Sequence, residues 1–151
     1  MAIKQFSLGS ILQFRKQQED LARQKFVLAQ IEEKKVEESL HVLQQELSSL
    51  IQTLEKKQET GILTFELARY EERINYLRQQ ISLTKRELEE KKKVVQHKKI
   101  MLLKKSKEHK ILEKLKENQN IAWQEYQNKK EAAMLDEIAV LHHERNDRDT
   151  N

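Results

Sequence analysis

The sequence contains no cysteine and no proline, and its only glycines are Gly9 and Gly61. Without cysteine there is no disulfide framework, no thiolate nucleophile and no zinc site built from cysteines. Without proline, and with so little glycine, almost nothing interrupts a helix over most of the chain. These absences favour long helices and exclude several kinds of chemical site.

Long hydrophobic runs are also missing. Residues 1–12 contain no apolar run of signal-peptide length, and no stretch elsewhere approaches a membrane span. Only 37% of the residues are hydrophobic and 36% are charged, which is lean for a globular core. We therefore expect a soluble, cytoplasmic protein whose apolar residues form a narrow stripe.

The first half of the chain carries such a stripe. Steps of four and three residues from Leu8 meet an apolar residue at eleven of fourteen positions. A stripe that keeps one phase over so many heptads is typical of a left-handed coiled coil. The positions are Leu8, Leu12, Arg15, Glu19, Ala22, Phe26, Ala29, Glu33, Val36, Leu40, Leu43, Leu47, Leu50 and Leu54.

A turn separates this stripe from a second one. Apolar residues vanish from Glu55 to Thr60, and Gly61 can adopt the left-handed conformation that ends a helix. A short connection between two amphipathic helices favours an antiparallel pair, because folding back buries both stripes. The second stripe comprises Leu67, Tyr70, Ile74, Leu77, Ile81, Thr84 and Leu88, and continues more loosely through Val95, Leu102 and Leu112.

The sequence thus predicts an all-α fold, a long two-helix antiparallel coiled coil in a single domain, residues 1–151. Helix one is expected at about 8–57, the turn at 58–63, helix two at 64–144 and a frayed tail at 145–151. At about 1.5 Å per residue the helices would span roughly 75 and 120 Å, so the C-terminal end should overhang. The two stripes face each other in this arrangement and form the seam between the helices. After Leu88 we expect weaker pairing of the helices, because Lys91, Lys98, Lys105 and His109 fall where the second stripe would continue along the seam.

No catalytic or cofactor site is predicted. The adjacent His142 and His143 point about 100° apart on a helix and cannot share a metal as an i, i+4 pair does. There is no glycine-rich phosphate loop, and a two-helix rod offers no concave pocket in which to desolvate a substrate. We therefore expect a protein that is not an enzyme and that holds no metal or cofactor.

Two features are open to more than one interpretation. Residues 91–116 contain eleven lysines and two glutamates but no arginine or aromatic residue, so specific nucleic-acid recognition is not expected. This stretch can be a solvated helix face, can bind the acidic surface of a partner protein, or can attract phosphates nonspecifically. Trp123 and Tyr126, three residues apart, could pack on helix one or anchor a partner.

Several segments resemble the flagellar export protein FliJ family. They are Phe6-Ser7-Leu8 with Ile11-Leu12 and Arg15, then Glu19 to Ala22; the ladder of Tyr70, Ile74, Leu77 and Ile81; and Lys130-Glu131 followed by Leu135-Asp136-Glu137-Ile138-Ala139. The resemblance covers essentially the whole chain. Two departures are the heavy lysine run and Arg73, where relatives often carry an aromatic or aliphatic residue.

The resemblance implies a component of the flagellar type III export apparatus, similar to the central stalk of rotary ATPases and peripherally associated with the inner membrane. Its implied partners are the export ATPase hexamer, the cytoplasmic part of the membrane export gate and export chaperones. The implied ATPase-side residues are Phe6, Leu8, Leu12, Phe14, Leu135, Asp136, Glu137, Ile138 and Leu141. The implied gate-side residues are Leu43, Leu50, Arg73 and Leu77.

Two competing interpretations stay open beside this one. Leu43, Leu50 and Leu77 also lie on the predicted seam, so they can be ordinary core leucines. The whole chain could be a generic structural or adaptor coiled coil, or a basic helical protein that binds nucleic acid or an anionic membrane.

Overall fold

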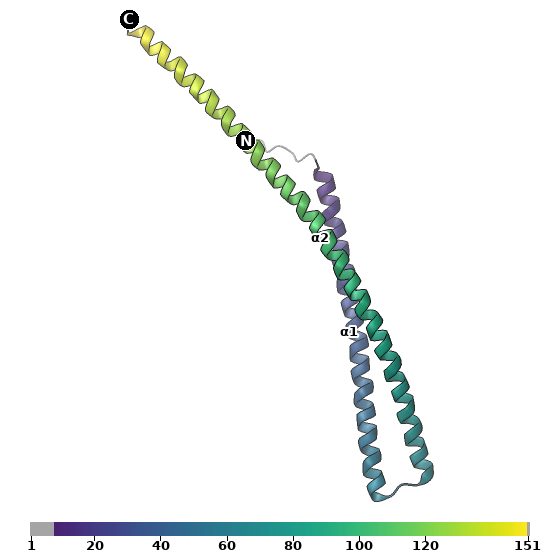
Figure 1. The fold of residues 1–151 in the computed structure, drawn as a ribbon. Coiled ribbons are helices and arrows are strands. Elements are labelled where there is room, and N and C mark those ends of the chain that lie inside the picture. Colours follow the sequence, from purple (N-terminus) through teal and green to yellow (C-terminus); the bar gives the residue numbers. More distant parts are fainter. Residues whose placement is uncertain (1–7, 151) are drawn as a thin grey trace. The chain divides into compact units, whose positions relative to one another are not determined.

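A computed structural model describes residues 8–150 of the chain (Figure 1). It contains two helices, α1 (Gly9–Thr60) and α2 (Thr64–Asp149), joined by residues 61–63, and there is no strand within residues 8–150. The predicted all-helical fold of two long, mutually packed helices is confirmed. Both helices run farther than the stripes suggested, because residues 58–60 and 145–149 are polar but contain no helix breaker.

The chain divides into two compact units. Residues 19–104 form one, which includes the turn, and residues up to Gln18 together with those from Lys105 onward form the other. Two ion pairs give the helix direction in the 19–104 unit. Arg73 Nη2 lies 2.6 Å from Glu46 Oε1 near the turn, and Lys91 Nζ lies 3.2 Å from Glu32 Oε2 farther from it. The helices are therefore antiparallel there.

The core of the 19–104 unit lies on the predicted seam. Leu40 of α1 and Ile81 and Leu88 of α2 form a buried cluster, against which Val36, Leu43 and Leu47 pack. Ile74 and Leu77 are also buried, and Leu77 is the most enclosed of them, with only 2% of its surface exposed. Burial of these aliphatic side chains removes apolar surface from water and stabilises the pairing of the helices.

The heptad phase is maintained on both sides of this cluster. Within the unit, every predicted seam position from Glu19 to Leu54 and from Leu67 to Leu102 is buried or half-buried. Lys91 and Lys98 are among them, so the seam continues past Leu88 with lysine stems in place of leucines. The fully buried apolar residues of α2 end at Leu88. Beyond Leu88, the seam therefore lies at the predicted positions, but its residues are less apolar.

The second unit contains the start of α1 and the C-terminal part of α2. Arg15 Nη1 donates to Glu108 Oε2 at 3.0 Å, and both side chains are about one-third exposed. Lys105 Nζ lies 3.7 Å from the same carboxylate oxygen. Leu12 and Leu112 are half-buried here, as the seam predicts, whereas Leu8 is exposed.

The turn depends on Gly61. Its φ of 99° is the one positive value among the described residues, and apart from Gly61 itself and its two neighbours in the chain no atom lies within 4 Å of where a Cβ would stand. Thr60 Oγ1 donates to the Lys57 carbonyl at 3.2 Å at the end of α1, and the Leu67 amide donates to the Leu63 carbonyl at 3.0 Å at the start of α2. Gly61 thus supplies a backbone conformation that other residues rarely adopt.

We expect Gly61→Ala to destabilise the protein by about 1–2 kcal/mol, because a Cβ disfavours this conformation even in open space. Gly9→Ala is the matched control: Gly9 lies in the first turn of α1, also with nothing nearby, and alanine should be neutral or slightly stabilising there. Thermal unfolding followed by circular dichroism measures both. Equal melting temperatures for the two variants would contradict the role assigned to Gly61.

Candidate partner-binding surfaces

The C-terminal segment of α2 presents apolar side chains to solvent. Every residue from Asn128 to Thr150 is exposed, and the exposed fractions of Leu135, Ile138 and Leu141 are 66%, 58% and 59%. Met134 and Val140 are similarly exposed. A cluster of large exposed aliphatic residues marks an interaction site more often than a solvated surface. This segment is therefore the strongest candidate for a partner-binding surface.

Just before this segment lies an aromatic pair. The ring centroids of Trp123 and Tyr126 are 5.7 Å apart and the rings are stacked at 28° to each other. Trp123 is half-buried, whereas Tyr126 is more than half exposed. Stacked aromatic rings stabilise each other, and Tyr and Trp are enriched at interfaces between proteins. The pair therefore extends the candidate surface of the exposed segment to residues 123–126 of α2.

The expected ATPase-side residues do not gather in one place. Phe6 lies outside the described residues; Phe14 is exposed on the outside of α1, while Leu12 is half-buried in the seam. Arg15, next to Phe14, contacts α2 at Glu108, and Leu135 lies roughly 40 Å farther along that helix at 1.5 Å per residue. Asp136 and Glu137 are exposed with Leu135. The start of α1 and the end of α2 are thus two separate surfaces.

The expected gate-side residues fall into two kinds. Leu77 is buried, and Leu43 and Leu50 are half-buried in the interhelical seam. Arg73 differs: its side chain is more than half exposed and forms the ion pair with Glu46. The core interpretation of the three leucines therefore accounts for their positions, and Arg73 is the member of the set that offers a surface.

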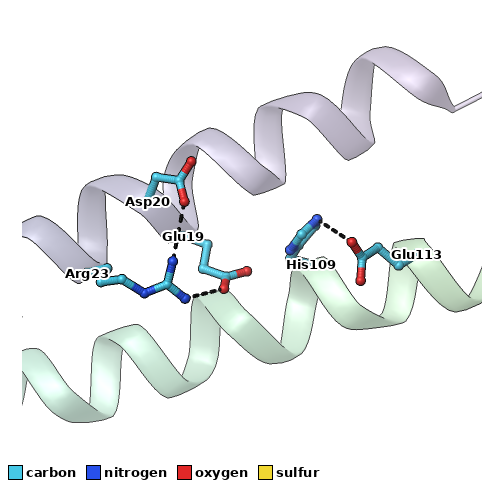
Figure 2. Close-up of polar contacts among 5 residues, drawn as sticks. All are labelled: Glu19, Asp20, Arg23, His109 and Glu113. Atoms are coloured by element: carbon cyan, nitrogen blue, oxygen red, sulfur yellow. Dashed lines mark hydrogen bonds and ion pairs between the residues drawn. The ribbon is translucent and has the colours of Figure 1, made fainter.

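Glu19 and His109 are polar residues at seam positions, one in each unit, and each has a charged neighbour on its own helix (Figure 2). In the 19–104 unit, Arg23 lies 2.8 Å from a carboxylate oxygen of the buried Glu19 and 3.5 Å from one of Asp20. In the other unit, His109 Nε2 lies 3.2 Å from Glu113 Oε1. Each is a contact between residues about one turn apart on the same helix. Neither arrangement places a nucleophile beside a base, so a structural role explains both.

The remaining histidines give no metal site. His143 Nε2 lies 3.6 Å from Asp147 Oδ2, and both side chains are largely exposed. Among residues 8–150 no group of three histidine, aspartate or glutamate side chains could hold a metal ion. Nor does that part of the chain contain a helix both long and apolar enough to cross a membrane.

A second exposed apolar surface was missed by the sequence reasoning. On the outer side of α1, Leu21, Leu28 and Ile31 are about half exposed, and Val27 and Leu28 line a shallow depression with Asp20, Arg23 and Gln24. The sequence does contain a pattern that indicates this surface, since Leu21, Leu28 and Val42 are spaced at multiples of seven residues outside the seam. The pattern is weaker than the seam stripe, which has an apolar residue at most of its positions.

Comparison with known proteins identifies one family. Residues 4–148 match the family model described as "Flagellar FliJ protein". No curated protein matches the chain, and no solved structure matches it. The match spans both helices and the turn between them, so it concerns the chain as a whole.

Proposed function

The chain belongs to the flagellar FliJ family, a family of flagellar export components, and on that basis we propose that it is a noncatalytic stalk of the export apparatus. In this role it binds the export ATPase hexamer and stimulates ATP turnover. It also contacts the cytoplasmic part of the membrane export gate and export chaperones, and so associates peripherally with the inner membrane.

The observation that carries this proposal is the family match over residues 4–148, and the exposed end of α2 supports it. A protein without a phosphate-binding loop can accelerate an ATPase by binding more tightly to its active conformation than to other conformations. That requires a surface able to contribute binding energy. Leu135, Ile138 and Leu141 form such a surface, and burying them against the ring would remove their apolar area from water.

The gate contact is assigned to the part of the 19–104 unit near the turn. Here the proposal relies on Arg73 with Glu46, because these side chains are at the surface while the neighbouring seam leucines hold the helices together. An exposed arginine can rearrange to pair with a carboxylate or stack on an aromatic ring of a partner. The two partners would then use different parts of the chain.

We expect this protein to raise the ATP turnover of its cognate export ATPase severalfold while it has no turnover of its own. Steady-state phosphate release, measured at increasing amounts of the protein, tests this. The control is the same titration with the protein heated and checked by circular dichroism for loss of helix. If a saturating amount of the folded protein leaves turnover unchanged, the stalk proposal is wrong and a generic coiled-coil adaptor explains the chain better.

A further inference from the structure

The outward side of α2 in the 19–104 unit is rich in lysine. Here we define the lysine face as Lys92, Lys93, Lys99, Ile100, Leu103 and Lys104, all of which are exposed. At 100° per residue they lie on one side of the helix, opposite the half-buried seam residues Val95, Lys98 and Leu102. The lysine face is thus a surface that the coiled coil does not use.

The charge of the lysine face is largely uncompensated. Among the described residues, no carboxylate lies within 4.0 Å of the ammonium groups of Lys93, Lys99 or Lys104, and Lys92 reaches Glu89 only at 4.0 Å. By contrast, Lys91 on the seam is 3.2 Å from Glu32. Like charges close together repel and raise the local potential, which attracts anions. The face therefore favours a negatively charged partner.

The residue types of the face distinguish between possible partners. Residues 91–116 contain no arginine and no aromatic, whereas protein interfaces are enriched in both and depleted in lysine. Reading or stacking on nucleic-acid bases also depends on arginine or aromatic side chains. Lysine instead supplies hydrated point charges that require no fixed geometry. Such charges suit the mobile phosphate groups of a lipid surface best.

Two aliphatic residues lie between these lysines. Ile100 and Leu103 are 56% and 59% exposed, one helical turn apart, with Lys99 and Lys104 beside them. Aliphatic side chains next to lysines are typical of helices that lie in the boundary between headgroups and acyl chains. Clusters of four or more basic residues on a helix are likewise typical of binding to anionic lipids.

We propose that the lysine face binds the surface of a bilayer that contains anionic phospholipids. Lys92, Lys93, Lys99 and Lys104 contact headgroup phosphates, and Ile100 and Leu103 insert into the interfacial region. The helix lies on the membrane without crossing it, while its opposite side stays packed in the coiled coil. This inference does not depend on the proposed export function, because it requires only the face and the lipid.

Cosedimentation of the whole protein with vesicles of phosphatidylcholine, with or without phosphatidylglycerol, tests the proposal. We expect binding only with phosphatidylglycerol, weakening as salt is added. Lys93→Gln, Lys99→Gln and Lys104→Gln together should reduce binding at least tenfold, since each lysine near an anionic surface contributes roughly fivefold. Ile100→Ser with Leu103→Ser should reduce it less while leaving the salt dependence intact.

The matched control removes the same charge elsewhere. Lys25, Lys34 and Lys35 are exposed on α1, outside the lysine face, and changing all three to glutamine should alter binding by less than about twofold. Circular dichroism confirms that each variant keeps its helices. Absence of binding to phosphatidylglycerol vesicles, or equal losses in the two triple variants, would overturn the proposal.

A duplex oligonucleotide at the same salt concentration provides the remaining comparison. Tighter binding to the oligonucleotide than to the vesicles, lost in the Lys93, Lys99 and Lys104 variant, would overturn the lipid assignment in favour of a nucleic-acid surface. Weaker binding to the oligonucleotide than to the vesicles supports the lipid assignment, because nonspecific phosphate attraction then accounts for the oligonucleotide binding. No ATPase is present in these assays, so their failure leaves the stalk proposal untouched.

Discussion

Leu77→Asp should melt the coiled coil near the turn and lower the free energy of unfolding by about 4 kcal/mol or more. Leu77 has 2% of its surface exposed, so the carboxylate would either lose its hydration without a partner or force the helices apart. A coiled coil of two helices has few other contacts to absorb this cost. Leu47→Asp, at a half-buried position that packs on the cluster of Leu40, Ile81 and Leu88, should add to the effect.

The control for this prediction is Leu83→Asp. Leu83 lies on the same helix less than two turns away, but 56% of its surface is exposed, so an aspartate there keeps its hydration. Urea unfolding followed by circular dichroism compares the two variants. Leu77→Asp with an unchanged unfolding midpoint would show that the seam does not hold the helices together, and the gate-binding interpretation of Leu77 would regain support.

The second large effect concerns the end of α2: replacing Leu135, Ile138 and Leu141 together with serine should abolish stimulation of the export ATPase. These side chains are about 60% exposed, so the substitutions cost little stability and the helices around Gly61 should stay folded. Removal of residues 135–151 should have the same result. Phosphate release with equal amounts of intact and altered protein measures it.

Two controls distinguish the end of α2 from other surfaces. Leu28, Ile31 and Val42 are comparably exposed on α1, and their joint replacement by serine should leave stimulation intact. Arg73→Glu, near the turn, should also leave stimulation intact while weakening binding to the gate. If the shortened chain stimulates as well as the intact one, the ATPase binds elsewhere and the assigned polarity is reversed.

The fold could be predicted because the information that specifies it is local. A heptad stripe determines which side of a helix is buried, and the absence of apolar residues before Gly61 placed the turn within a few residues. The helix ends were less predictable, because residues 58–60 have adequate helix propensity without contributing to the stripe. Lys91 and Lys98 show the same limit, since their long stems fill seam positions that a hydrophobicity pattern counts as lost.

The candidate surfaces were harder to predict, because a binding site is defined by a second molecule that the sequence does not contain. The resemblance placed Leu77 and Arg73 in one gate-side set, whereas the heptad pattern already allowed Leu77 to be a core leucine; the burial of Leu77 and the exposure of Arg73 agree with the pattern. The resemblance also grouped Phe14 with Leu135, although the contact between Arg15 and Glu108 places the start of α1 well before the end of α2. The resemblance named a family correctly, but its residues stay predictions.

Along the seam of the 19–104 unit, aliphatic side chains near the turn give way to lysines farther from it. The free energy needed to separate the helices locally should therefore fall with distance from the turn. Near the turn, Ile74, Leu77 and Ile81 are buried, so separating the helices there exposes the most apolar surface to water. Past Leu88, separating them at Lys91 and Lys98 exposes lysine stems and breaks an exposed ion pair of small energetic value. Amide protons should therefore exchange slowly around Ile74 to Ile81 and progressively faster beyond Leu88. A pulling force applied to the far ends of the helices would separate them in sequence toward Gly61, and the last segment to yield would be the one that holds Leu77.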